Sequence, residues 1–296
     1  MSLPRRMLLA AVSIGLSLTA LPANAGTLDP IIEILPPLPV PYHPTSATEC
    51  ADGSPTCIGV TIAQMEKRYD ALRATCDHDA VFALAYLRVT ENVRDALDEG
   101  IYDDPVWLRN QDAAFAQDYY DSYDNWHAGR KNLVPQAWRI AFQAADDGSV
   151  SALGNFMLSM NAHINRDFSY VLADAGLTGA DGVSHKPDHN RFNARLDSLY
   201  HPVFSEEALE LDPRFDDVNL ANLDEEAVGA IMLGWRETVW RNAEALSLAK
   251  TPLALSIAKS NIETYATTQA VLYRSLFASS KARTAERNAY CHARQG

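Results

Sequence analysis

The chain has 296 residues, of which 38 are Asp or Glu and 25 are Lys or Arg, so its formal charge at pH 7 is -13. A surface this acidic repels the phosphate backbone, and we therefore expect no nucleic-acid partner. Hydrophobic residues make up 47% of the chain, which contains only 14 Gly and 15 Pro. This composition excludes a disordered protein and is typical of a globular chain with a sizeable core.

Residues 1–25 have the pattern of a secretory signal peptide. Arg5 and Arg6 precede an apolar run over residues 7–21, and Ala-Asn-Ala at 23–25 is a small-x-small cleavage site. The Arg5-Arg6 pair leaves the general and the twin-arginine export routes open. The apolar run is too short to span a membrane and no later run is longer, so we expect no transmembrane segment in the mature chain. The protein is predicted to be secreted or periplasmic.

Residues 26–56 are predicted to form a proline-rich extended arm followed by a cysteine loop. Six prolines fall between Pro30 and Pro44 and favour extended backbone. Ile, Leu and Val alternate with these prolines, which indicates that the arm lies along the surface of the domain.

Residues 57–296 show helical apolar spacing in one segment after another and no alternating strand pattern. Asp104 before Pro105 is an N-cap signal, Ser149 is a second, and Gly129 and Gly176 are stop signals. The expected helices cover residues 60–75, 79–99, 105–126, 135–142, 149–176, about 188–200 and 224–246, with a last one from 252. The sequence therefore predicts an all-α, single-domain multi-helix bundle.

Four cysteines in an exported chain indicate disulfides, for which three pairings are possible. Cys50 and Cys57 lie in a loop rich in Gly, Pro and Ser, which favours a small local ring and leaves Cys76 to pair with Cys291. The second bond would tie the C-terminus to an early helix. A metal thiolate site is the weaker alternative because no Cys-x2-Cys pair is present.

The expected helix over residues 79–99 is apolar on nearly every face, so its polar groups need partners. In the structural interpretation, Asp79 caps the helix and Glu91 pairs with an arginine such as Arg236. In the functional interpretation, the two carboxylates face a site.

The segment 160–168 carries polar side chains on both flanks of an apolar stripe. His163 and Asp167 share one flank, and Asn161 and Asn165 share the other. A His and a carboxylate four residues apart lie on one helix face, where they can bind a metal ion or form an acid–base pair.

A polar loop with Asp188 and His189 follows this helix. If it folds back, it can complete a shell of imidazole and carboxylate ligands of the kind that zinc or iron favours. A solvated polar loop is the alternative. Further along, Arg236 and Trp240 are four residues apart and able to stack, or else belong to the core.

The segment 160–168, MNAHINRDF, closely resembles the M-N-A-H-I-N-x-D-L signature of a bacterial helical family known only as a domain of unknown function. Similar stretches occur in the same order at residues 79–91, 104–107, 135–139 and 235–240. Phe168 stands where Leu is more usual. The resemblance extends from about Tyr69 to Ala249 and implies a helical fold, with no established reaction.

The leading functional hypothesis is a hydrolase in which a divalent transition metal, zinc or iron, activates a water. The His-x3-Asp pair is similar to ligand pairs in helical zinc-dependent phospholipases and single-strand nucleases, which implies a phosphoester or lipid substrate. The residues proposed for this site are His163, Asp167, Asp79, Asp188 and His189 as metal ligands, with Glu91 and Arg236 beside His163 and Asp167 as catalytic groups.

Two alternatives remain open at this level. The chain can be a non-catalytic envelope protein that binds a small ligand or a partner, in which Asn161, Asn165, His163 and Asp167 form a buried hydrogen-bond network. It can also use His163, without a metal, as a general base that Asp167 orients.

Overall fold

The computed structural model describes residues 35–43, 54–215 and 225–295. The predicted signal peptide and Cys50 lie outside these ranges. The helices are α2 (Thr56–Thr75), α3 (Ala80–Asp98), α4 (Pro105–His127), η2 (Lys131–Leu133), α5 (Gln136–Asp146), α6 (Ala152–Asn161), η3 (Ala162–Phe168), α7 (Ser169–Ala175), α8 (Lys186–Glu210), α9 (Glu225–Leu248), α10 (Pro252–Leu276) and α11 (Lys281–Gln295). The described residues contain isolated bridges but no strand, which confirms the all-α prediction.

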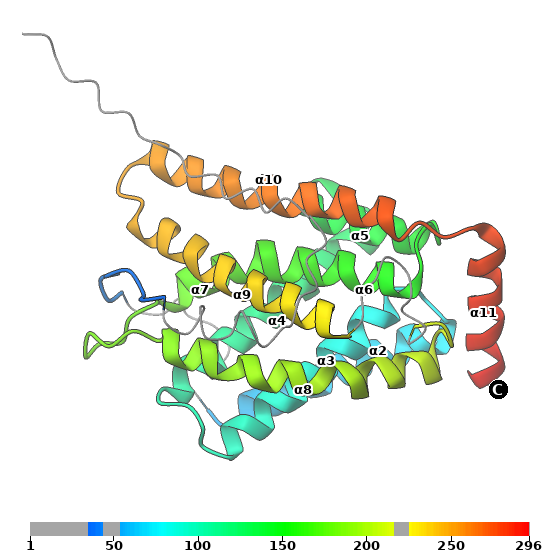
Figure 1. Ribbon diagram of the computed structural model, residues 1–296, viewed down its shortest axis with the longest axis horizontal. Coiled ribbons are helices and arrows are strands. Elements are labelled where there is room, and N and C mark those ends of the chain that lie inside the picture. Colours follow the sequence, from blue (N-terminus) through cyan, green and yellow to red (C-terminus); the bar gives the residue numbers. More distant parts are fainter. Residues whose placement is uncertain (1–34, 44–53, 216–224, 296) are drawn as a thin grey trace, which may run out of the picture.

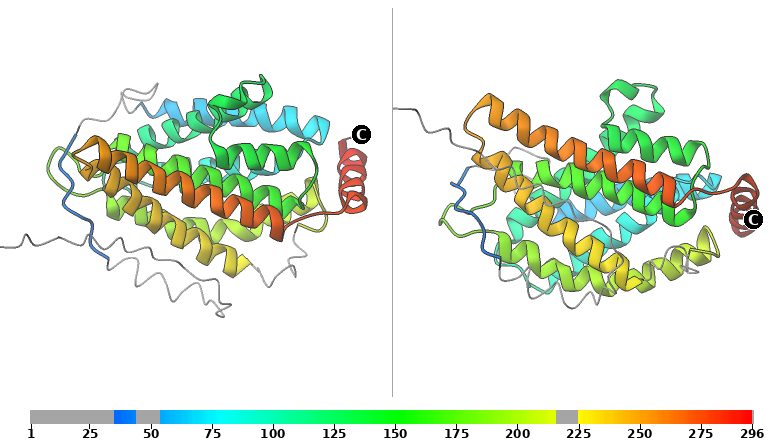
Figure 2. Two further views of the ribbon diagram at one scale, coloured as in Figure 1. Left: turned by 90° about the horizontal axis from the view of Figure 1, so that it is seen from above. Right: turned by 45° about the horizontal axis from the view of Figure 1, so that its top comes forward.

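The helices surround a central helical run formed by α6, η3 and α7 (Figure 1). The helices α5 and α10 pack along one side of this run, while α3 contacts α6, and α9 contacts both η3 and α7. The helix α8 packs against α3 and α9, and α11 lies across one end of the bundle (Figures 1 and 2). The segment with the family signature therefore lies at the centre of the domain.

The central run is buried because its sequence is small or apolar on all sides. Every residue from Ala152 to Asn161 is buried. At Gly154 the chain leaves no room for a side chain, because a Cβ would lie 2.6 Å from Cβ of Phe277. The Ser151 hydroxyl accepts a hydrogen bond from the Gly154 amide, so Ser151 is the N-cap and the predicted cap at Ser149 is wrong by two residues.

Two other boundaries differ from the sequence prediction. The helix α8 starts at Lys186 and continues to Glu210 with Pro202 inside it, whereas the sequence predicted a short helix ending near Tyr200. A proline inside a helix costs about 3 kcal/mol, and burial of Val203 and Phe204 offsets that cost. A separate helix, α11, follows α10 and was not predicted.

The helix α11 is linked to the body by a disulfide. Cys76 and Cys291 are bonded with Cα atoms 5.9 Å apart, across a sequence separation of 215 residues. Cys76 directly follows α2 in a left-handed conformation. The predicted Cys76–Cys291 pair is confirmed, while the second predicted pair includes Cys50, outside the described residues.

Residues 35–43 of the proline-rich arm lie against the body, as predicted. The Leu38 amide donates to Glu244 Oε1 at 2.7 Å, and the Thr178 hydroxyl donates to the Val40 carbonyl at 2.7 Å. The side chain of Val40 is buried in the core. These contacts fix the described part of the arm along α9 and the loop that follows α7.

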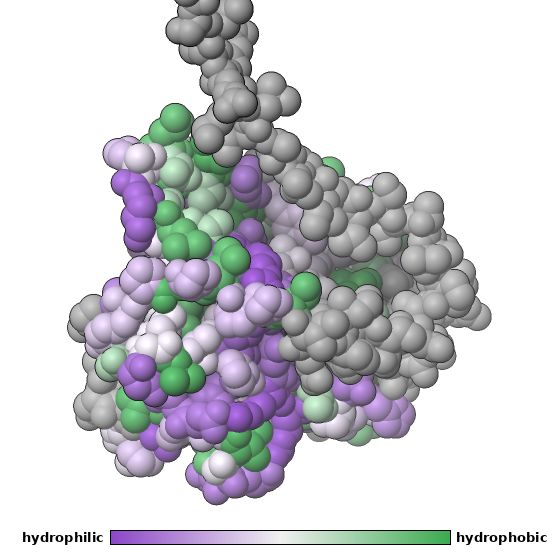
Figure 3. Space-filling model, turned by 60° about the vertical axis from the view of Figure 1, so that its left-hand side comes forward, coloured by the Kyte–Doolittle hydropathy of each residue, from purple (hydrophilic) through white to green (hydrophobic). Residues whose placement is uncertain are grey.

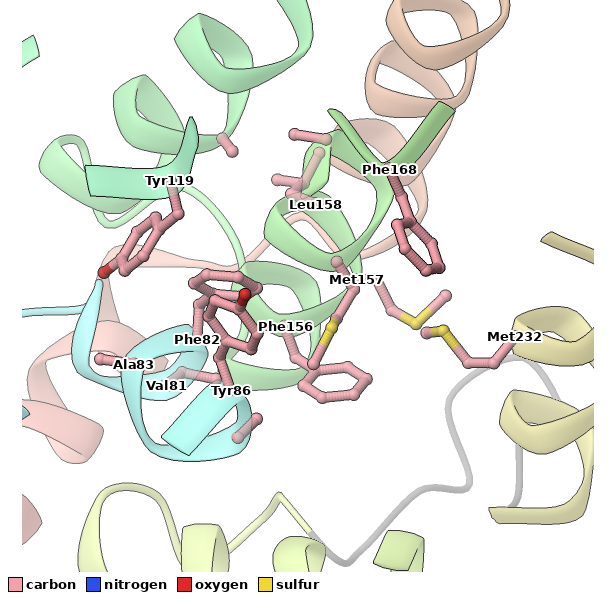
Figure 4. Close-up of a cluster of buried hydrophobic side chains, with 14 of the residues drawn as sticks. Val81, Phe82, Ala83, Tyr86, Tyr119, Phe156, Met157, Leu158, Phe168 and Met232 are labelled. Carbon is pink, nitrogen blue, oxygen red and sulfur yellow. The ribbon is translucent and has the colours of Figure 1, made fainter. Parts of the chain in front are cut away.

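None of the helices in the described ranges is long and apolar enough to cross a membrane. On the face drawn in Figure 3, the coloured residues show hydrophobic patches that are interrupted by hydrophilic ones. Large apolar side chains are instead concentrated in the interior, where Phe82 and Tyr86 of α3 extend toward Phe156 of α6, and Phe168 lies near Met232 (Figure 4).

Candidate functional site

A cavity of about 90 Å³ lies between α3, α4, α6, η3, α8 and α9. One water needs about 10–15 Å³, so the cavity has room for several waters or for part of an organic ligand. The cavity is partly open to solvent, so a longer ligand can extend out of it. Its wall is mainly apolar. Apolar side chains around it include Val89, Val93, Leu108, Phe156, Met160, Ile164, Phe192, Leu199 and Met232. This is the composition of a site for an apolar small molecule.

His163 and Asp167 are brought together by the backbone of η3. This segment is a π-helix, a wide turn that occurs frequently at functional sites. His163 Nδ1 lies 3.5 Å from Asp167 Oδ2, and both side chains are fully buried. Of these two residues, only His163 lines the cavity. The sequence prediction that these two side chains are neighbours is confirmed.

The imidazole of His163 is enclosed by aromatic rings. It stacks on Phe115 with centroids 3.5 Å apart, and the rings of Phe82, Tyr86 and Tyr119 approach its edges and faces. Burial lowers the pKa of His163, and the nearby Asp167 carboxylate opposes that shift. His163 Nε2 has no hydrogen-bond partner in the described residues. Nδ1 also has no hydrogen bond, although it lies 3.5 Å from Asp167 Oδ2. The lowered pKa makes the imidazole neutral at pH 7, with neither ring nitrogen hydrogen-bonded in the described residues.

Asp167 is held by two stronger donors. Trp138 Nε1 donates to Oδ2 at 2.7 Å, and Arg166 Nη1 donates to Oδ1 at 2.8 Å. A buried carboxylate that accepts an indole and a guanidinium is satisfied without any metal ligand role. Asp167 can fix the orientation of His163, but most of its hydrogen-bonding capacity serves the core.

Asn161 and Asn165 form a network on the other side of the central run. The Asn165 amide donates to Asn161 Oδ1 at 2.9 Å, and the Asn161 amide donates to the Ala266 carbonyl at 2.9 Å. Both residues are completely buried. Asn161 links α6 to α10, and Asn165 of η3 is bonded to Asn161. Neither residue lines the cavity, so their role is structural.

Asp188, His189 and Arg236 lie on the opposite wall of the cavity. Asp188 accepts the backbone amides of Asp103 and Asp104 at 2.9 and 2.8 Å, so it fixes the loop before α4. His189 Nε2 lies 3.0 Å from the Arg236 carbonyl, and burial together with the Arg236 charge keeps the pKa of His189 well below its usual range. Asp188 and His189 were predicted in a polar loop but lie in the first turn of α8. They do reach the cavity, where Asp188 is already bonded to the backbone amides.

Asp79 and Glu91 lie away from the cavity wall. Asp79 occupies the N-cap position of α3, yet its side chain caps nothing. Its Oδ2 is 3.3 Å from His127 Nε2, and burial raises its pKa to about 6. Glu91 accepts from Arg88 at 2.7 Å, so it does pair with an arginine as predicted, but the partner is Arg88 and not Arg236. Asp79 and Glu91 therefore bond to different partners, His127 and Arg88, and neither takes part in the cavity.

Nowhere in residues 35–43, 54–215 and 225–295 do three side chains of His, Cys, Asp or Glu converge as a metal would require. His163 and Asp167 come together, but Asp79, Asp188 and His189 do not join them. The zinc or iron site stays a prediction that rests on the first pair alone.

Several cavity groups were missed from the sequence. Asp112 of α4 is 6% exposed, has no hydrogen bond or ion pair within the described chain, and lines the cavity beside Gln111. Burial raises the pKa of Asp112 to about 7. In the sequence, Asp112 lies one turn after Leu108 and three residues before Phe115, so the three share one face of the helix. A carboxyl group on this otherwise apolar face was the signal that could have identified Asp112 from the sequence.

Comparisons with known proteins add a family but no activity. No curated protein and no solved structure matches the chain. One family model matches residues 58–276, a range that includes the central run and every cavity-lining helix. The chain therefore belongs to this family, described as a family of unknown function, DUF5995.

Proposed function

We propose that this protein binds one small, mainly apolar molecule in the cavity between α3, α4, α6, η3, α8 and α9, in an extracytoplasmic compartment. The observation that carries this proposal is an apolar cavity whose wall includes polar groups without partners. Unpartnered atoms in the described wall are Tyr86 Oη, Gln111 Oε1, Asp112 Oδ2 and both ring nitrogens of His163. The buried disulfide supports an oxidising compartment.

The energetic argument is that several unsatisfied polar groups around one cavity are costly. Each buried polar atom without a hydrogen bond costs about 1–3 kcal/mol. Polar atoms of a ligand or of waters bound with it would recover part of this cost, while the apolar wall accepts the rest of the ligand. Asn161 of the core differs from these wall groups, because its amide nitrogen donates to the Ala266 carbonyl and its Oδ1 accepts from Asn165. Oδ1 of Asn165 itself has no partner in the described residues.

Filling the cavity is expected to abolish binding of an apolar probe. N-phenyl-1-naphthylamine is neutral and its fluorescence rises in an apolar site, so titration of the wild-type protein should saturate at one probe per chain. Val89→Trp places an indole at the cavity wall and should weaken probe binding at least about tenfold.

The matched control is Val60→Trp on α2, because Val60 is exposed and does not line the cavity. It should bind the probe as the wild type does. The proposal fails if the wild type shows no saturable binding, or if both variants bind equally well.

The metal-dependent hydrolase stays a prediction based on His163 and Asp167. His163→Ala separates it from the binding proposal. If the imidazole is a packing element of the cavity wall, its loss against Phe115 should lower the free energy of unfolding by about 2–3 kcal/mol. If it is a metal ligand, the variant should lose bound metal and keep its fold.

The measurement is plasma mass spectrometry of metal content, together with a thermal melt, on protein purified without a His tag. His292→Ala in the exposed part of α11 controls for removal of an imidazole. Near-stoichiometric metal in the wild type that disappears only in His163→Ala would favour the hydrolase over simple binding.

A further inference from the structure

The cavity wall contains a buried guanidinium with no counter-ion. Arg236 of α9 is 8% exposed and lines the cavity. Its Nε donates to Asn193 Oδ1 at 2.6 Å, and its Nη2 donates to the His189 carbonyl. In the part of the chain that the structure describes, Nη1 has no hydrogen-bond partner and no carboxylate lies within ion-pair distance of the guanidinium. Nη1 is accessible, and Arg236 lines both the cavity and a smaller pocket that Asp197 also lines.

Other arginines near this region show what is missing. Arg241, less than two turns further along α9, pairs with both Glu237 and Glu244. Arg166 pairs with Asp167 and Glu263. Unlike these two arginines, Arg236 has no carboxylate partner in the described residues, so a bound anion could neutralise its charge.

The groups around Arg236 cannot neutralise it. The rings of Phe168 and Phe192 lie 5.7 and 5.8 Å from its guanidinium carbon, a contact worth about 0.5–2 kcal/mol. Asp188 already accepts two backbone amides and Arg191. An unpaired buried charge costs several kcal/mol, and here burial lowers the pKa of Arg236 to about 10. The guanidinium remains charged at neutral pH and needs an anion.

The surroundings select the kind of anion. Two phenols, Tyr102 and Tyr200, lie close enough to Arg236 to interact with its charge, and the hydroxyl of Tyr102 has no partner in the described residues. His189 is neutral, so Arg236 is the one cationic side chain among the cavity-lining residues. Of the two carboxyl groups on the wall, Asp188 is paired with Arg191, and burial raises the pKa of Asp112 to about 7. One guanidinium and neutral donors match a singly charged carboxylate, whereas a phosphate monoester with nearly two charges would need a second cation.

We propose that the cavity binds an apolar monocarboxylate of the fatty-acid type, with its carboxylate on Nη1 of Arg236 and its chain along the apolar wall. The proposal rests on the binding function above and specifies its ligand. Nη1 donates to a carboxylate oxygen, and no covalent step is involved. The chain would run toward α3 and α4, whose Val89, Val93 and Leu108 form the apolar side.

The test compares ligands that differ only at the polar end. Dodecanoate, its methyl ester and dodecyl phosphate are titrated by displacement of N-phenyl-1-naphthylamine, below their micelle concentrations. The wild type should bind dodecanoate at least about tenfold more tightly than the ester, because only the acid pairs with the guanidinium.

Two variants address Arg236. Arg236→Gln should lower the affinity for dodecanoate to that for the ester and leave the ester unchanged. Asn193→Asp keeps Arg236 and places a carboxylate beside its Nε, so it should compete with the ligand and also lower dodecanoate affinity by about tenfold. Arg68→Gln, on α2 and outside the cavity, is the control and should change nothing.

The outcomes separate the two proposals. If the neutral probe does not bind the wild type, the binding function itself fails. If the probe binds but acid and ester bind equally, or dodecyl phosphate binds more tightly than dodecanoate, the binding function stands and the carboxylate assignment is overturned. If Arg236→Gln does not fold, Asn193→Asp provides the test instead. An unchanged affinity of that variant for dodecanoate overturns the carboxylate assignment.

Discussion

Replacing Cys76 and Cys291 together with serine is expected to lower the free energy of unfolding by about 3–5 kcal/mol. The bond closes a loop across a separation of 215 residues, so its removal releases a large conformational entropy in the unfolded chain. Both cysteines are also buried, so the two hydroxyls would enter an apolar contact between α11 and the end of α2. The loss should appear first as detachment of α11, the helix that the bond holds.

The measurement is urea unfolding followed by circular dichroism, with the double variant compared to the wild type without reductant. His292→Ser, next to Cys291 but exposed, controls for a serine in α11. A loss below about 1 kcal/mol would show that α11 docks through its own contacts, such as the Arg287 hydrogen bond to Asn155 at 2.8 Å.

Asp112→Asn is expected to stabilise the protein above pH 7 and to change little near pH 4. Burial raises the pKa of Asp112 to about 7 in the folded state, from an ordinary value of 3.8. Between these values the folded protein binds more protons than the unfolded chain, so stability falls as pH rises through this window. A pKa difference of about three between the folded and unfolded states corresponds to a loss of up to about 4 kcal/mol in the free energy of unfolding at pH 8. The neutral amide of Asn has no such loss.

The free energy of unfolding of both proteins is measured from pH 4 to pH 8, and the difference between them is plotted against pH. It should be near zero below the ordinary pKa and grow until about pH 7. Asp121→Asn, on the exposed side of α4, should give a flat difference. A flat difference for Asp112→Asn would mean that solvent or a partner reaches that carboxylate in the folded state.

The local features of the fold were predictable from the sequence. The Asp104 side chain accepts from the Trp107 amide at the start of α4, and Gly129 and Gly176 follow helix ends with positive φ angles of 74° and 87°. The proximity of His163 and Asp167 was predictable for the same reason. Caps, stops and pairs four residues apart depend on backbone geometry over one or two turns, which short segments specify.

Predictions about contacts between distant parts of the chain were only partly correct. The pairing of Cys76 with Cys291 was predicted because a local Cys50–Cys57 ring leaves these two cysteines over, and the structure contains that bond. The pairing of Glu91 with Arg236 rested only on opposite charge, and Glu91 binds Arg88 on its own helix instead. The continuation of α8 through Pro202 was missed because a local helix penalty is offset by burial against other helices.

By itself the sequence determined an all-α domain, its helix signals, one disulfide and a buried His163–Asp167 pair. Only the tertiary structure decided that Arg236 and Asp112 share an apolar cavity with His163, each without a charged partner in the described chain. The physical reason is that burial and the lack of a counter-ion are properties of what surrounds a side chain. Those surroundings come from helices that are distant in sequence, and no periodicity within one helix encodes them.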